Sequence, residues 1–184
     1  MRKIEGWNEI EKNEVVEFVN LGAGPQVCKI LKVLDVQDKE YLKIAFDVSG
    51  GEFKGCFKEQ LDRDDRDDKK WPNSGIMYKS YKASAARFFA AFVTSVEKSN
   101  TGYKFEWKEQ SLVGKTFVAN FREEEWLTDD NEVKVSLKCY EPRSTIALQE
   151  GRIKTMEIKK LEGRPMPKEK TPIDINKPVN DLPF

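Results

Sequence analysis

The stretch YLKIAFDV, residues 41–48, alternates strictly along its length. One set of alternate positions is apolar, namely Leu42, Ile44, Phe46 and Val48. The other set is Tyr41, Lys43, Ala45 and Asp47. Successive side chains of a strand point to opposite faces of its sheet, so this period of two predicts a β-strand with one face in a core.

The flanking residues extend this strand into a predicted antiparallel meander. The run VCKILKVLDV (27–36) precedes it and predicts a first strand. The residues SGG (49–51) predict a hairpin turn, because glycine supplies the positive φ that such turns need. The run EFKGCFK (52–58) then predicts the return strand, with Phe53 and Phe57 on one face.

The rest of the chain predicts one principal helix and two longer strands. After a polar loop (60–75), apolar residues at i, i+3, i+4 and i+7 predict a helix from about Ser80 to the SNTG segment at 99–102, with Phe88, Phe89 and Phe92 in the core. A short strand (103–107), two strands (112–126 and 132–142) around a turn at 128–131, and a short helix (144–151) are expected to follow. Proline and lysine dominate from Glu162, where no structure is expected.

This order of three strands, a helix and two strands is that of the OB-fold, whose helix plugs one end of a five-stranded barrel. The sequence therefore predicts a mainly β protein with an OB-fold barrel and a disordered C-terminal tail. The expected domain spans residues 1–161, with its core at about 22–155, and the tail spans 162–184.

Composition excludes several classes of activity. The 32 basic and 32 acidic residues cancel, which argues against nucleic-acid binding by bulk attraction and leaves a local patch as the alternative. The absence of histidine excludes His-dependent catalysis and His-containing zinc sites. Cys28, Cys56 and Cys139 are too few for an all-cysteine zinc site, and no phosphate-binding glycine motif occurs. We expect no enzyme activity, no metal and no cofactor.

The acidic run DRDDRDD (62–68) does not fit a calcium loop, because Arg66 and Asp67 break the alternate spacing and no glycine lies inside it. A solvated loop is expected instead. The odd cysteine count fits a reducing compartment, and the chain shows neither a secretory signal nor an apolar run of transmembrane length. The expected location is therefore the cytoplasm, without membrane association.

Basic and aromatic residues occur together where acids are missing. From Lys69 to Val96 there is no Asp or Glu. Lysine and arginine neutralise phosphates, while aromatic rings stack on unpaired bases, so this mixture is typical of single-strand binding. For each of Trp71, Tyr78 and Tyr81, packing within the protein and stacking on a base are left as equal alternatives. The candidate DNA-binding residues, which include strand positions expected to face outward, are Lys43, Lys54, Lys58, Trp71, Tyr78, Lys79, Tyr81, Lys82, Arg122, Trp126, Lys134, Lys138 and Tyr140.

Two features resemble phage single-stranded DNA-binding proteins. The ending NDLPF (180–184) is similar to the acidic tip with which bacterial and phage members of this class close, behind a linker. The segments AFDVSGGEFKG, KKWPNSG, FFAAFVTSVEKSNTGYKFEW and LVGKTFVANFREEEW resemble small replication-region proteins of phages from Gram-positive hosts. By this resemblance, Asp181, Leu182, Pro183 and Phe184 bind partner proteins, although this tail is less acidic than bacterial tails.

The resemblance implies a protein that coats single-stranded DNA during phage replication and recombination in the host cytoplasm, and recruits replication and recombination proteins through its tip. A homo-oligomer is left open. The alternative is an OB-like protein-interaction module of a replication complex without DNA binding, which the zero net charge favours. Nuclease or annealase activity is a distant third.

Overall fold

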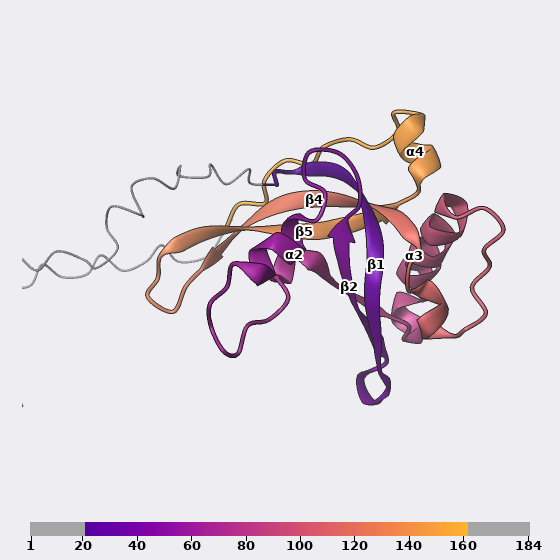
Figure 1. Ribbon diagram of the computed structural model, residues 1–184, viewed down its shortest axis with the longest axis horizontal. Coiled ribbons are helices and arrows are strands. Elements are labelled where there is room, and N and C mark those ends of the chain that lie inside the picture. The colour runs from indigo at the N-terminus through magenta and orange to yellow at the C-terminus, as the bar shows by residue number, and fades with distance from the viewer. Residues whose placement is uncertain (1–20, 162–184) are drawn as a thin grey trace, which may run out of the picture.

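The computed structural model describes residues 21–161, which form one five-stranded antiparallel sheet with helices beside it (Figure 1). The strands are β1 (Gly24–Val36), β2 (Tyr41–Val48), β3 (Ile76–Ser80), β4 (Thr116–Leu127) and β5 (Val133–Arg143), in the order β3-β2-β1-β4-β5. The α-helices of this range are α2 (Cys56–Asp62), α3 (Ala86–Ser99) and α4 (Thr145–Gln149). The predicted mainly β architecture is confirmed.

Strand β2 has the predicted bounds and the predicted alternation. Its four apolar positions are buried, and Ile44 lies opposite Val33 of β1 and Met77 of β3. Phe46 is fully buried, with its ring edge-on to the Phe117 ring of β4 at 5.3 Å. One face of the sheet therefore carries the core, and we call the opposite face the outer face.

The predicted third strand over 52–58 is wrong. This segment turns at Gly55, whose φ is 77°, and enters α2. The carboxylate of Asp47 accepts the backbone N–H groups of Phe57 and Lys58 at 3.1 Å each, which fixes the first turn of that helix. Phe53 and Phe57 are four residues apart, a spacing that suits a helix as well as a strand.

The third strand is instead β3, which lies between the predicted polar loop (60–75) and the predicted helix start at about Ser80. Helix α3 consequently begins at Ala86, after a short 3-10 turn at 83–85. Phe89 and Phe92 are buried as predicted, but Phe88 is 65% exposed and does not join the core. Residues 103–107 form no strand. The predicted final hairpin and the short helix within 144–151 are confirmed.

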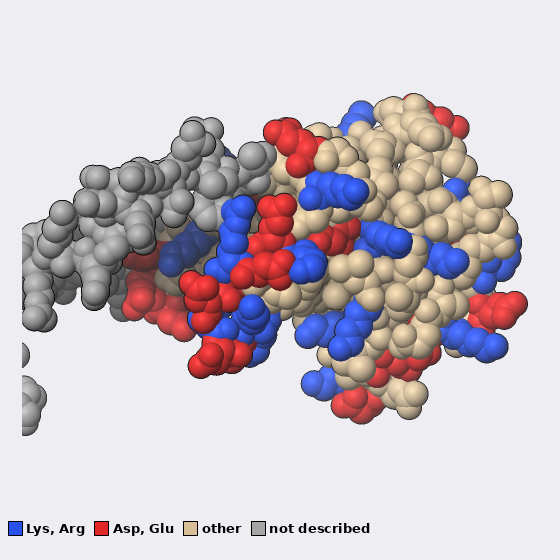
Figure 2. All heavy atoms as spheres, in the orientation of Figure 1, with Lys and Arg blue, Asp and Glu red and all other residues tan. Residues whose placement is uncertain are grey.

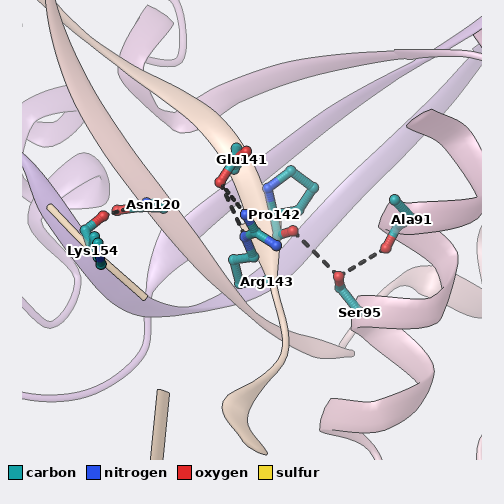
Figure 3. Close-up of polar contacts among 7 residues, drawn as sticks. All are labelled: Ala91, Ser95, Asn120, Glu141, Pro142, Arg143 and Lys154. Atoms are coloured by element: carbon teal, nitrogen blue, oxygen red, sulfur yellow. Dashed lines mark hydrogen bonds and ion pairs between the residues drawn. The ribbon is translucent and has the colours of Figure 1, made fainter. Parts of the chain in front are cut away.

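The two edge strands of the sheet approach one another without pairing. Just before β3, the Ser74 hydroxyl donates to the Leu137 carbonyl of β5 at 2.8 Å. Helix α3 covers the adjacent end, where the Ser95 hydroxyl donates to the Pro142 carbonyl at 3.2 Å and to the Ala91 carbonyl at 2.8 Å (Figure 3). Within residues 21–161, β3 and β5 form no ladder, so the sheet is unclosed.

The chain after α4 returns along β4. The Asn120 amide donates to the Lys154 carbonyl at 3.1 Å (Figure 3), and Lys159 exchanges backbone hydrogen bonds with Glu123 and Glu125. None of the described helices is long and apolar enough to cross a membrane. The predicted tail at 162–184, with its tip, lies outside the described residues.

Candidate nucleic-acid interface

The outer face of β1, β2 and β3 presents lysine and tyrosine side chains side by side. Lys43 of β2 lies opposite Tyr78 of β3 and Leu34 of β1. Tyr41 packs edge-on against Tyr78, with 5.6 Å between ring centroids, and Tyr78 is 58% exposed. The pairing of these strands thus holds an accessible aromatic ring beside an ammonium group.

A groove of about 340 Å³ runs across this face. Residues that line it include Lys32, Leu34, Lys43, Lys70, Trp71 and Ile76. Its charged lining residues are three lysines, and no carboxylate lines it. We call this feature the lysine groove. A groove that is basic and partly apolar suits an anionic ligand that also has flat apolar surfaces.

Trp71 is both packed and part of the lysine groove. Its indole N–H donates to the carbonyls of Phe46 at 3.3 Å and Gly75 at 3.1 Å. A Cβ at Gly75 would lie 2.5 Å from the indole nitrogen, so the close approach requires glycine. The ring is therefore held rigidly by one edge while it lines the groove.

A second hollow of about 420 Å³ separates β3 from β5. Tyr78, Tyr140 and Phe88 line it, and Lys79 lies there as well. Lys79 is on the core side of β3, 6.0 Å from the Phe92 ring, and burial lowers the pKa of its ammonium group. Tyr78 lines this hollow and lies opposite Lys43. The hollow therefore continues the outer surface of β2 and β3 toward β5.

The β4–β5 hairpin brings five candidate residues to one face. By register and alternation these are Arg122, Trp126, Lys134, Lys138 and Tyr140. The Arg122 guanidinium lies 3.7 Å from the centre of the Tyr140 ring. Basic and acidic side chains intermingle over the part of the surface where α2 and this hairpin lie (Figure 2).

Glu124 neutralises part of this hairpin face. Its carboxylate forms ion pairs with Arg122 and, at 2.9 Å, with Lys138. The hydrogen bond from Arg122 is the main cause that lowers the pKa of Glu124, so the group is ionised at neutral pH. The hairpin is therefore less attractive to phosphate than the lysine groove.

We expect Glu124→Gln to raise the affinity for single-stranded DNA, because it frees two cations on the hairpin face. The Lys138 side chain is 58% exposed, and freeing a surface charge of this kind changes the free energy by up to about 1 kcal/mol, which corresponds to an increase of up to about fivefold. Fluorescence anisotropy with a labelled oligo-dT measures the change. Glu150→Gln, which frees Arg152 beyond α4, is the matched control and should leave the affinity unchanged. Lower affinity of the Glu124 variant would mean that its ion pairs position the hairpin for binding.

Four candidates do not join these surfaces. Lys54 lies in the turn before α2, and Lys58 pairs with Asp62 at 2.6 Å on α2, so neither projects from a strand. Tyr81 packs against Phe89 on the core side, and its hydroxyl donates to Asp35 at 2.9 Å. Lys82 is exposed just beyond β3. Lys54 and Lys58 were expected to face outward from the misplaced third strand, whereas Tyr81 and Lys82 were named from the acid-free segment at 69–96.

The prediction omits Lys32, Leu34, Tyr41, Lys70 and Ile76 as site residues. Tyr41 and Lys43 share a face in the sequence pattern, so the pattern could have found Tyr41. The others depend on the pairing of β2 with β3, and on the loop that folds Trp71 against Gly75. Lys70 lies beside Trp71 in the acid-free segment at 69–96, so that segment could have found it, whereas no such signal distinguishes Lys32 and Leu34 from solvated positions.

Comparison with known proteins does not assign the chain to a family. No protein-family model matches the sequence, and no curated protein matches it at significant similarity.

Proposed function

We propose that this protein binds single-stranded DNA, without catalysis, on the outer face of β1, β2 and β3. The observation that carries the proposal is the lysine groove, where Lys32, Lys43 and Lys70 surround a rigid Trp71 and no carboxylate is present. The exposed Tyr78 beside it provides a stacking surface. The zero net charge provides no bulk attraction for DNA, so the proposal rests on this local basic surface.

The proposed fold is an OB-fold barrel. The strand order β3-β2-β1-β4-β5 is the order that such a barrel has when it is opened between its third and fifth strands. Helix α3 lies between β3 and β4 in sequence and covers one end of the sheet (Figure 1). The Ser74–Leu137 hydrogen bond supports an approach of the two edges, and the Ser95–Pro142 hydrogen bond holds α3 against β5.

In this proposal each class of side chain has its own role. The rings of Tyr78 and Trp71 stack on unpaired bases, which contributes about 1–3 kcal/mol per base with little sequence preference. The three lysines neutralise phosphates and release counterions. A duplex keeps its bases stacked inside and offers the rings no base face, so single strands are preferred.

Anisotropy of a labelled oligo-dT, titrated with the protein at several salt concentrations beside a duplex of equal length, tests the proposal. Three phosphate contacts predict a slope of about −2 for log affinity against log salt. Weak duplex binding is expected. Equal binding to both nucleic acids, or no binding at low salt, would contradict the proposal.

The tail is proposed to recruit partner proteins of phage replication and recombination in the host cytoplasm. Deletion of residues 180–184 removes the candidate anchors Leu182 and Phe184 and the candidate charge of Asp181. We expect this deletion to leave the affinity for oligo-dT equal or higher and to abolish capture of replication proteins in a pull-down. Loss of DNA binding by the truncated protein would refute this division of roles.

A second candidate is a protein-interaction module. The Glu124 ion pairs and the zero net charge favour it, since they weaken the attraction for a polyanion. In that case the lysine groove would receive an acidic protein segment, and the oligo-dT titration would show no saturable binding.

A further inference from the structure

A pocket of about 370 Å³ lies on the core side of the sheet, opposite the lysine groove. Four aromatic residues line it, namely Tyr81, Phe89, Phe105 and Trp107, together with the carboxylates of Asp35 and Glu109. These residues come from the ends of β1 and β3, from α3 and from the segment after it. The DNA-binding proposal uses none of them.

Trp107 is held at this pocket in an unusual conformation. Its φ is 59°, in the left-handed region that bulky residues rarely adopt. The indole is stacked on Phe89, with 6.0 Å between centroids and 20° between planes, yet the residue is 77% exposed. A strained backbone that presents a large ring to solvent, rather than burying it, indicates a binding role.

The pocket is also acidic. Asp35 and Glu109 are its only charged lining residues, while the neighbouring Lys82 and Lys108 do not line it. Asp35 accepts one hydrogen bond from the Tyr81 hydroxyl at 2.9 Å and no other from residues 21–161. Burial, followed by the carboxylates of Asp35, Glu40 and Asp38, raises the pKa of Tyr81. The surroundings therefore favour a cation and repel phosphate.

We propose that this pocket binds an arginine side chain of a partner protein. A guanidinium group stacks flat on an indole ring and donates in a fork to a carboxylate, and its aliphatic stem packs on aromatic surface. Trp107 supplies the ring, and Asp35 and Glu109 supply the carboxylates. A nucleic-acid strand would bring its phosphates against both carboxylates. This inference does not depend on DNA binding.

The test is an NMR titration of the full-length protein with N-acetyl-arginine methylamide, and separately with its citrulline counterpart. Citrulline has the same shape as arginine without the charge. We expect saturable shifts of the Trp107 indole N–H with the arginine probe and at least about tenfold weaker binding of the citrulline probe.

Variants of the pocket complete this test. Asp35→Asn combined with Glu109→Gln should weaken arginine binding by at least about tenfold as well, because it removes both negative charges. The fold should be retained, since the amide oxygen that replaces the Asp35 carboxylate can still accept from the Tyr81 hydroxyl. Trp107→Ala should abolish arginine binding, and Tyr78→Ala on the outer face should not change it.

Three results would overturn the proposal. Equal binding of the citrulline probe would make the pocket a purely apolar site. The absence of saturable shifts at the solubility limit of the arginine probe would show that no guanidinium site exists. Shifts of the Trp107 indole with oligo-dT that arginine does not compete would assign the pocket to nucleic acid.

Discussion

Tyr78→Ala is expected to weaken binding of oligo-dT by about 5- to 150-fold, the loss of one base stacked at about 1–3 kcal/mol. Tyr78 is 58% exposed and lies on the outer face of the sheet rather than in the core, so the fold should be retained without its ring. Anisotropy at fixed salt measures the affinity, and thermal unfolding checks that Tm is unchanged.

Trp107→Ala is the matched control for this variant. It also removes an exposed aromatic ring, but from the acidic pocket on the other side of the sheet. Its affinity for oligo-dT should equal that of the natural sequence. Equal losses in both variants would mean that exposed rings bind the strand nonspecifically, and no loss with Tyr78→Ala would remove the lysine groove from the binding site.

Gly75→Ala is expected to lower the free energy of unfolding by about 1–3 kcal/mol, the usual cost of adding a methyl group to a well-packed core. We expect a value near the upper end of this range. Its Cβ would lie 2.5 Å from the Trp71 indole nitrogen, 2.8 Å from the Phe57 ring and 3.0 Å from the Phe46 carbonyl oxygen. The ring can move only by breaking its hydrogen bonds to Phe46 and Gly75. Urea denaturation measures the change.

Gly50→Ala separates this steric effect from the general effect of replacing glycine. Nothing lies within 4 Å of a Cβ at Gly50, and its φ is not positive. Its stability should be unchanged or slightly higher, because alanine restricts the unfolded chain. If Gly75→Ala were as stable as Gly50→Ala, Trp71 would not be rigidly held, and its role in the lysine groove would fail.

The parts of the fold that follow from local periodicity could be predicted. Strand β2 has its predicted bounds because four alternate apolar residues enter one core. The third strand could not be predicted in this way. Strand β3 has five residues, of which only Met77 is deeply buried, whereas the run at 52–58 places two phenylalanines at a spacing common to strands and helices. The helix is favoured by the hydrogen bonds that the Asp47 carboxylate accepts from Phe57 and Lys58, which lie 10 and 11 residues further along the chain.

The candidate site was predictable to the extent that it follows strand alternation. The five hairpin candidates share one face because β4 and β5 are long and adjacent in sequence. Lys43 was named from the alternation of its strand and Tyr78 from the acid-free segment at 69–96, but their pairing depends on the register of β2 and β3. Neither the neutralisation by Glu124 nor the contact of Trp71 with Gly75 can be derived from spacing, since both depend on tertiary packing.

Photo-crosslinking of an oligonucleotide that carries 4-thiothymidine, followed by trypsin digestion and mass spectrometry, locates the bound strand on the protein. We propose that a single strand lies across the lysine groove between Trp71 and Tyr78, and both residues belong to the tryptic peptide WPNSGIMYK, residues 71–79. We expect this peptide to carry the principal crosslinks, and unlabelled oligo-dT, but not duplex, to compete them away. Crosslinks confined to the segment around Trp107, or none above background at saturating protein, would contradict this binding site.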